Sequence, residues 1–150
     1  MSAEQIDKVL RSLGVEAELD TEFGQYRAIV AEHDGEPLLG CTVRVDDGHC
    51  LIATAMIAQA VPDDRLPAVV EFITRINFSQ TYGGFDVDID ESFVQFRTGL
   101  DFTNETLTDT LVRNTILGAI NGMRGYLNSL VSVIEGDDAL TAWQTATGNS

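Results

Sequence analysis

The stretch FDVDIDESFVQFR, residues 85–97, decides how the second half of the chain folds. Its three aspartates stand at alternate positions and are separated by apolar residues. In an extended strand, Asp86, Asp88 and Asp90 would share one face, while the apolar side chains would share the other face. The pattern therefore predicts a half-buried β-strand that turns back into a second strand ending near Arg97.

The same three aspartates also suggest a calcium-binding loop as an alternative. An EF-hand loop requires a glycine at its sixth position and a bidentate glutamate at its twelfth. In this stretch Glu91 occupies the sixth position and Arg97 the twelfth. We therefore expect no calcium ion at Asp86, Asp88 and Asp90, and the chain shows no other metal-binding or cofactor motif.

A hairpin over this stretch has a testable register. With Glu91-Ser92 as its loop, the predicted cross-strand pairs are Ile89 with Val94, Val87 with Phe96, and Asp86 with Arg97. The first two pairs face the core, and the third brings opposite charges together on the outer face. A one-residue slip would turn the aspartates toward the core, which the burial of charge opposes.

Two Asp-Gly pairs predict the strands that come before this hairpin. Asp34-Gly35 and Asp47-Gly48 can each supply the two positive φ angles that a type I′ turn requires. They divide the sequence into a three-stranded meander over about residues 25–33, 37–46 and 49–60. The predicted core pairs are Val30 with Leu39, Ala28 with Cys41, Tyr26 with Val43, Val45 with Cys50, and Val43 with Ile52.

This register also separates the two cysteines. It places Cys41 opposite Thr54, roughly 13 Å along the strand from Cys50. A disulfide cannot join residues that far apart. We therefore expect two reduced cysteines that act as small core residues, with Cys41 and Val43 both buried.

Two helices are predicted around the meander. The first begins in a capping box at Ser2 and ends at Gly14. The second follows Asp63-Asp64 and ends near Asn77, with apolar residues at helical spacing between them. Residues 15–24 alternate only weakly, so a short strand and an extended connector stay open as alternatives.

A third helix is predicted over about residues 105–135, with Asn104 or Thr106 as its cap. Its apolar stripe consists of Val112, Ile116, Ala119, Ile120, Met123, Leu127, Leu130 and Ile134. The opposite face carries small, uncharged residues, and its three glycines cost roughly 2–3 kcal/mol relative to alanine. One explanation is a kink or break between residues 118 and 125. The other is close packing against another element or subunit at Gly118, Asn121, Gly122, Gly125 and Ser129.

Composition limits the classes of function. The 150 residues are 44% hydrophobic, which suits one globular domain with a single core. From the pattern along the chain we expect one α+β domain over residues 1–136 and a polar C-terminal tail, docked or frayed, over residues 137–150. The net charge of −15 repels polyanions, so we expect neither nucleic acid nor an anionic membrane as a partner. No signal peptide or membrane span is recognisable, and we expect a cytoplasmic location.

No motif with a catalytic mechanism is present. The chain has no GxSxG elbow, P-loop, GxGxxG or HExxH sequence. Its only histidines, His33 and His49, are expected at opposite ends of the meander, too far apart to share a metal ion. The sequence therefore predicts a protein that is not an enzyme.

Several positions carry a family resemblance. NFSQTYGGFDVDIDESFVQFRTGLDF (residues 77–102) is followed by a long helix that ends in LNSLVSVIEG (residues 127–136). Asn77 closes a helix, Gly84-Phe85 opens a strand, and VQFR (residues 94–97) forms the next strand. These features resemble the YbjN-like family of bacterial sensory transduction regulators, whose fold is similar to that of CesT-like type III secretion chaperones. The motifs cover the C-terminal half, and the element order covers the whole chain.

The resemblance implies an α+β fold of the type III secretion chaperone kind, with an antiparallel five-stranded sheet and the element order α-βββ-α-ββ-α. It implies no known catalysis and suggests protein binding, often as a homodimer, in regulation or signalling. The alternative function is a small-molecule sensor or an enzyme that uses a pocket between the sheet and the helices. The sequence names neither the partner nor a ligand, because a fold does not determine a function.

Overall fold

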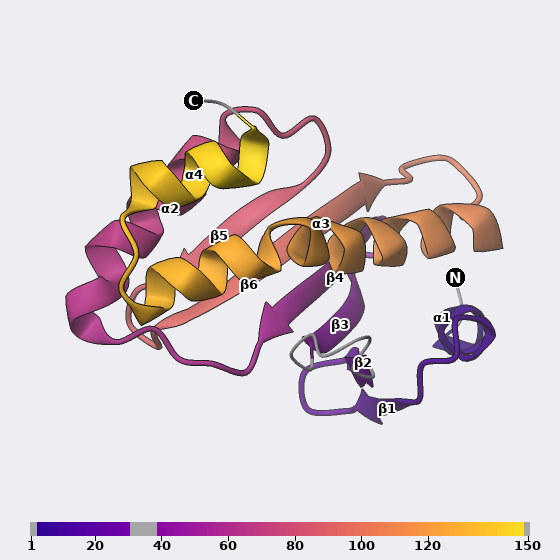
Figure 1. Cartoon of the computed structure of the whole chain (residues 1–150). Coiled ribbons are helices and arrows are strands. Elements are labelled where there is room, and N and C mark those ends of the chain that lie inside the picture. The colour runs from indigo at the N-terminus through magenta and orange to yellow at the C-terminus, as the bar shows by residue number, and fades with distance from the viewer. Residues whose placement is uncertain (1–2, 31–38, 149–150) are drawn as a thin grey trace.

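A six-stranded antiparallel sheet in the order β1-β2-β3-β4-β6-β5 organises the computed structural model, which describes residues 3–30 and 39–148 (Figure 1). The strands are β1 (Ala17–Asp20), β2 (Gln25–Val30), β3 (Leu39–Asp46), β4 (Cys50–Ile57), β5 (Gly84–Asp88) and β6 (Phe93–Asp101). The helices are α1 (Ala3–Ser12), the short 3₁₀ helix η1 (Asp63–Arg65), α2 (Leu66–Asn77), α3 (Asp109–Glu135) and α4 (Ala139–Thr147). The α+β class and the antiparallel sheet are confirmed, and the predicted elements occur in the predicted order. The structure adds β1 and α4, so the sheet has six strands rather than five.

The sixth strand, β1, comes from the segment that the sequence pattern left open. It pairs with β2 at the edge of the sheet, where Glu18 lies opposite Arg27. An ion pair of 3.0 Å between Asp20 Oδ2 and Arg27 Nε joins the two strands. Leu19 is half exposed even though it lies on the helix-covered side, which explains the weak alternation of this segment.

The predicted register between β2 and β3 is confirmed. Val30 pairs with Leu39, Ala28 with Cys41, and Tyr26 with Val43. Cys41 and Val43 are buried, as predicted. The Asp34-Gly35 turn and His33 lie outside the described residues.

The predicted register between β3 and β4 is wrong by one residue. Val45 pairs with Leu51 and Val43 with Ala53, instead of with Cys50 and Ile52. The shift turns Leu51, Ala53, Ala55 and Ile57 toward the core, where all four are buried. The face of β4 that was expected to be buried therefore points away from the helices.

His49 causes this shift. Asp47 and Gly48 have the positive φ angles of 53° and 75° that the predicted turn requires. His49 does not enter the strand, because its backbone N–H donates to the Asp46 carbonyl (3.2 Å) and its carbonyl accepts from the N–H of Phe102 (2.9 Å). The loop therefore has three residues instead of two.

The register between β5 and β6 is displaced by two residues. Phe85 pairs with Phe96, and Val87 pairs with Val94. The turn is longer than predicted, and the carboxylate of Asp88 accepts from the N–H of Glu91 within it (2.9 Å). A shift of two residues keeps each side chain on its predicted face.

Two consequences follow from the longer turn. Ile89 lies in the turn and is exposed instead of facing Val94. Arg97 still reaches Asp86, although the two residues are diagonal rather than opposite, and the Nε–Oδ2 distance is 2.9 Å. Asp86 and Asp88 therefore lie on the outer face of β5, as predicted, whereas Asp90 lies in the turn.

The helices differ from the prediction mainly at the start of α3. Thr108 caps this helix, and its Oγ1 accepts from the N–H of Leu111 (3.2 Å), so neither Asn104 nor Thr106 is the cap. The helix is continuous from Asp109 to Glu135, and the break that the sequence left open does not form. No helix among the described residues is long and apolar enough to cross a membrane.

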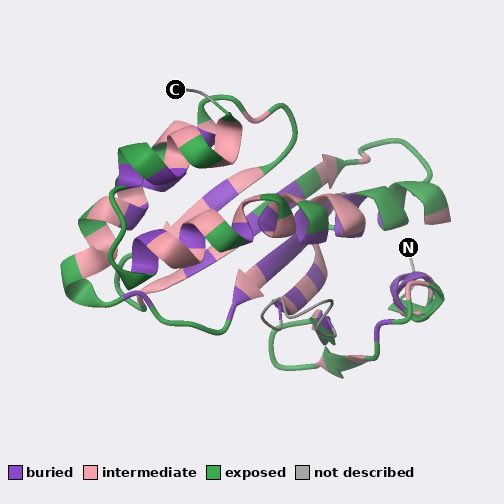
Figure 2. Cartoon of the chain, in the orientation of Figure 1, coloured by how far each residue is buried: buried purple, intermediate pink, exposed green. Residues whose placement is uncertain are grey.

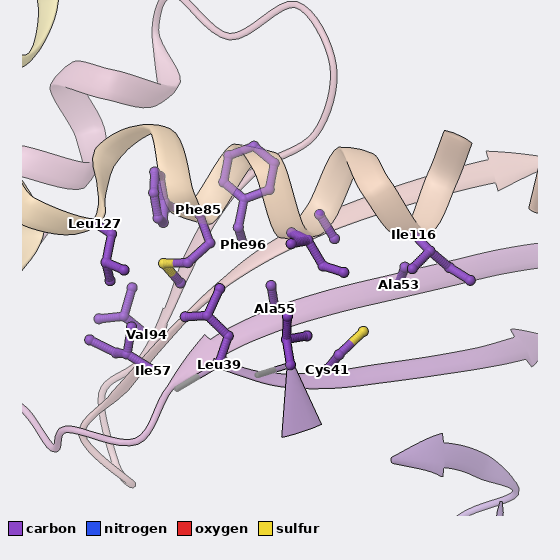
Figure 3. Close-up of a cluster of buried hydrophobic side chains, with 14 of the residues drawn as sticks. Leu39, Cys41, Ala53, Ala55, Ile57, Phe85, Val94, Phe96, Ile116 and Leu127 are labelled. Atoms are coloured by element: carbon purple, nitrogen blue, oxygen red, sulfur yellow. The ribbon is translucent and has the colours of Figure 1, made fainter. Parts of the chain in front are cut away.

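The core lies between α3 and the sheet. Every residue of the predicted α3 stripe is buried, and buried residues alternate with less buried ones along the strands that face this helix (Figure 2). Side chains of β3, β4, β5 and β6 meet Ile116 and Leu127 of α3 in this layer (Figure 3). In the described part of the chain, no helix covers the other face of the sheet, where Arg27, Ile29 and Arg97 are exposed.

The C-terminal segment is docked rather than frayed over its described part. Asp138 caps α4 by accepting from the N–H of Thr141 (3.0 Å). Ala139 and Ala142 are buried, and α4 lies beside α2 (Figure 1). The division into a domain over residues 1–136 and a polar tail over residues 137–150 stays a prediction.

Candidate partner-binding surface

The structure separates the residues that the sequence grouped as one interface on α3. Gly118 and Gly122 face the sheet side of the molecule, whereas Asn121 and Gly125 are exposed and Ser129 is half-buried. The five residues therefore do not form one surface. Two glycines belong to internal packing, and the exposed residues remain for a partner.

Gly122 allows α3 to lie directly on Phe96 of β6. A Cβ at position 122 would lie only 2.6 Å from Cδ1 of the Phe96 ring. The Phe96 ring packs edge-on against Phe85, with 4.9 Å between the ring centroids. Because aromatic packing fixes the ring, it leaves no room for a side chain on the helix.

Gly118 makes a second close approach one turn earlier. A Cβ at this position would lie 2.9 Å from the Tyr82 ring and 3.2 Å from Cγ2 of Thr98. Thr98 also donates from its Oγ1 to the carbonyl of Thr115 (2.6 Å), which ties β6 to α3 in the buried layer. The helix-propensity cost of these two glycines is therefore offset by contact between α3, β6 and the connection before β5.

The outward side of α3 is exposed and uncharged. Its residues Asn114, Asn121, Gly125 and Asn128 are all exposed, and we call this surface the α3 face (Figure 2). Between residues 114 and 132 the helix carries one charged residue, Arg124. No described atom lies within 4 Å of the place that a Cβ on Gly125 would occupy. In a chain with a net charge of −15, this is an unusually neutral surface.

Two exposed aromatic residues precede β5. Phe78 is 96% exposed and Tyr82 is 49% exposed, although Tyr82 packs on Gly118 at the side of α3. The connection between them is held by Gln80, whose Nε2 donates to the hydroxyl of Tyr126 on α3 (3.0 Å). Exposed aromatic side chains beside a neutral helix are typical of protein-binding surfaces.

The helix-free face of the sheet has a different chemistry. Arg27, Arg44 and Arg97 lie on it, and each is paired with an aspartate, at 3.0, 2.9 and 2.9 Å respectively. A depression of about 950 Å³ is lined by residues of this face, among them Arg27, Thr42 and Met56, and also by Asp7 and Arg11 of α1. A smaller one of about 480 Å³ is lined by Ile52, Gly84, Arg97 and Gly99 among others. Both are open depressions rather than enclosed pockets, although the second is also lined by Asn77 at the end of α2.

Metal-ligating and nucleophilic groups are dispersed among the described residues. The carboxylate of Asp86 forms an ion pair with Arg97, and that of Asp88 accepts a hydrogen bond from the N–H of Glu91 in the turn. No group of three or more His, Cys, Asp or Glu side chains among the described residues could hold a metal ion. Cys41 and Cys50 are both free thiols. Burial raises the pKa of Cys41 to about 12, so this thiol stays protonated and unreactive near neutral pH.

Comparison with known proteins fits this architecture. Residues 2–130 match the sequence model of the YbjN family, described as "putative bacterial sensory transduction regulator". The chain belongs to the YbjN family. No curated protein sequence matches the chain.

Two solved structures are similar to this YbjN-family chain. The crystal structure of YbjN from E. coli superposes with a TM-score of 0.52 at 11% identity, over 99% of this chain and 93% of that one. A chain of the HopA1-SchA chaperone-effector complex superposes with a TM-score of 0.50 at 15% identity, over 81% of this chain and 89% of that one. These superpositions establish a shared fold, and the type III secretion chaperone-like fold predicted from the sequence is confirmed.

The sequence pattern missed the role of Asn77. Its side chain hydrogen-bonds both backbone groups of Phe85 on the edge strand β5. The sequence feature that could have indicated this contact is an asparagine at a helix end, followed by Gly83-Gly84 and a strand. The exposure of Phe78 carried no signal, because an apolar residue after a helix is more often buried.

Proposed function

We propose that this YbjN-family protein is a non-enzymatic protein-binding module with a chaperone-like or regulatory role. It acts in the cytoplasm as a homodimer, and the α3 face forms the contact between its two copies. The neutrality of the α3 face is the observation that carries this proposal. Two copies with a net charge of −15 each repel one another wherever their acidic surfaces meet, and a contact through uncharged residues avoids that cost.

The geometry of the α3 face supports contact with a second helix. Gly125 leaves open space above the backbone, and Asn121 offers a carboxamide one turn earlier. Small residues allow two helix backbones to approach closely, and a carboxamide can bond its own copy across a two-fold axis. The proposed contact residues are Asn121 and Gly125 at the centre with Ser129 at the edge, whereas Gly118 and Gly122 pack inside the chain.

Protein binding agrees with what is known of the similar proteins. The family is described by a regulatory role, and one chain of similar fold comes from a chaperone-effector complex. A binding module needs an accessible surface rather than a reactive site. Tyr82 provides a half-exposed aromatic side chain next to α3, and Phe78, at the end of α2, is almost fully exposed, so a further protein partner can bind there.

Site-specific photo-crosslinking tests this function. A benzoyl-phenylalanine at position 121 is irradiated in the cells that naturally produce the protein, and the adducts are identified by mass spectrometry. We expect adducts with a second copy or with one recurrent protein. The same probe at position 44, on the helix-free face, is the control and should not crosslink a second copy. If position 121 yields no protein adduct, the α3 face is not a partner-binding surface.

A further inference from the structure

On the outer edge of β5, one side chain, that of Asn77, hydrogen-bonds the strand backbone. β5 is the last strand of the sheet, and α2 lies beside it (Figure 1). Nδ2 of Asn77 donates to the carbonyl of Phe85 (2.9 Å), and the N–H of Phe85 donates to Oδ1 of Asn77 (2.8 Å). One carboxamide therefore makes the pair of hydrogen bonds that a residue of a neighbouring strand would make.

Three residues of the local sequence, Asn77, Gly83 and Gly84, make this contact possible. Asn77 is the last residue of α2, so its side chain projects where the helix ends beside β5. A Cβ on Gly84 would lie 3.3 Å from Oδ1 of Asn77, so a larger residue there would push the carboxamide away. Gly83 has a φ of 76°, and its Cβ would lie 2.6 Å from the carbonyl oxygen of Arg97. Two consecutive glycines therefore let the chain enter β5 close to both β6 and Asn77.

An unprotected β5 edge would be prone to pair with another strand. Phe85 points its backbone groups away from β6, and the two-residue alternation of the ladder makes Val87 do the same. The neighbouring connections expose large apolar side chains, Phe78 and Tyr82 before the strand and Ile89 after it. Free backbone groups next to exposed apolar residues are a template for strand addition between molecules.

We propose that Asn77 is a guard residue that closes the β5 edge against strand addition by a second copy of this chain. By occupying Phe85, it leaves Val87 as a single outward-facing residue, which is too short a stretch for a stable intermolecular ladder. Asp88, on the outer face of the same strand, adds like-charge repulsion between two such edges. The guard goes beyond the proposed function, because it concerns a different surface from the α3 face.

Hydrogen exchange of the unmodified protein gives the first test. The amide of Phe85 should exchange far more slowly than that of Val87, because only the former has an acceptor on the outer edge. In Asn77→Ala, the protection of the Phe85 amide should fall by roughly five- to tenfold in the monomer, the factor expected for one hydrogen bond. Equal exchange of Phe85 and Val87 in the unmodified protein would overturn the proposal.

Sedimentation velocity gives the second test. Asn77→Ala should form species larger than those of the unmodified protein as its concentration rises. Adding Val87→Pro should abolish this extra association, because proline removes the remaining outward N–H without breaking a bond to β6. Ser79→Ala is the matched control, since it removes a side-chain hydrogen bond in the same connection (to Ile76, 3.1 Å) without touching β5. An unchanged mass for Asn77→Ala, or association that survives Val87→Pro, would contradict the guard role.

Discussion

The ring of Phe96 lies against the bare backbone of Gly122, so that α3 and β6 are in contact without an intervening side chain. This relationship explains a glycine in the middle of a long helix that would otherwise lose about 1 kcal/mol relative to alanine. It also fixes the depth at which α3 lies on the sheet. The position of the exposed α3 face follows from that depth.

Gly122→Ala should lower the free energy of unfolding by about 1–3 kcal/mol, because the new methyl group would overlap a ring that cannot move freely. Urea denaturation measures this change. Gly125→Ala is the matched control when both substitutions are made in an Asn121→Glu background, which we expect to be monomeric. There its methyl group meets open space and alanine favours the helix, so it should stabilise by about 0.5–1 kcal/mol. Equal effects of the two substitutions would show that Gly122 is not a packing requirement.

The two cysteines should differ in reactivity. Iodoacetamide at neutral pH should label the half-buried Cys50 and leave Cys41 unlabelled until the protein unfolds. Labelling followed by mass spectrometry of the tryptic peptides measures both rates. Rapid modification of Cys41 in the folded protein would mean that β3 opens, or that its register differs from the one described.

Cys41 should also make stability depend on alkaline pH. Its pKa is raised to about 12 by burial, whereas in the unfolded chain the thiol titrates near its usual value of about 8.5. Above that value the unfolded state loses a proton that the folded state keeps, so stability should fall as the pH rises toward 12. Cys41→Ala should show a shallower decline in urea titrations. An identical decline would assign the effect to other groups.

Asp109 should hold α1 against the start of α3. Its carboxylate accepts from Lys8 Nζ (2.8 Å) and from Gln5 Nε2 (2.9 Å), and these hydrogen bonds lower its pKa, the one from Lys8 most strongly. A lowered pKa means that the stabilisation is present at neutral pH and is lost as the pH falls through the folded-state pKa.

Hydrogen exchange of the Val9 and Leu10 amides measures how firmly Asp109 holds α1. Asp109→Asn should reduce their protection at neutral pH, and the difference from the unmodified protein should shrink under acidic conditions where the native carboxylate is protonated. Asp64→Asn, in the exposed start of η1, is a control that should leave α1 unchanged. A difference that persists unchanged in acid would show that charge at Asp109 is not what holds α1.

Local patterns predicted the elements better than their pairing. The alternation around Cys41 and Val43 predicted both the strand and its register with β2, because burial penalises any slip. The Asp47-Gly48 turn has the expected conformation, yet the register failed because a bond from Phe102, about fifty residues away in sequence, holds His49 in the loop. The pattern of residues around a turn does not show which distant residue will contact it.

The candidate interface shows the same limit. Its glycines marked a place of close approach, but Gly122 meets Phe96 inside the chain while Gly125 meets open space. Helical periodicity places both on one side of α3 and cannot tell which neighbour each one has. The hydrogen bonds of Asn77 depend on the path from α2 into β5, which becomes visible only in three dimensions.

Sedimentation equilibrium of the unmodified protein and of Asn121→Glu shows whether the α3 face joins two copies. The unmodified protein should have twice the monomer mass at micromolar concentration. Asn121→Glu should have the monomer mass, because two facing carboxylates would repel across the contact, while far-UV circular dichroism stays the same. A glutamate at the exposed Asn128, nearer the end of the α3 face, should weaken the dimer less. A monomer mass for the unmodified protein at every concentration, or a dimer that Asn121→Glu leaves intact, would contradict the proposal that the α3 face joins two copies.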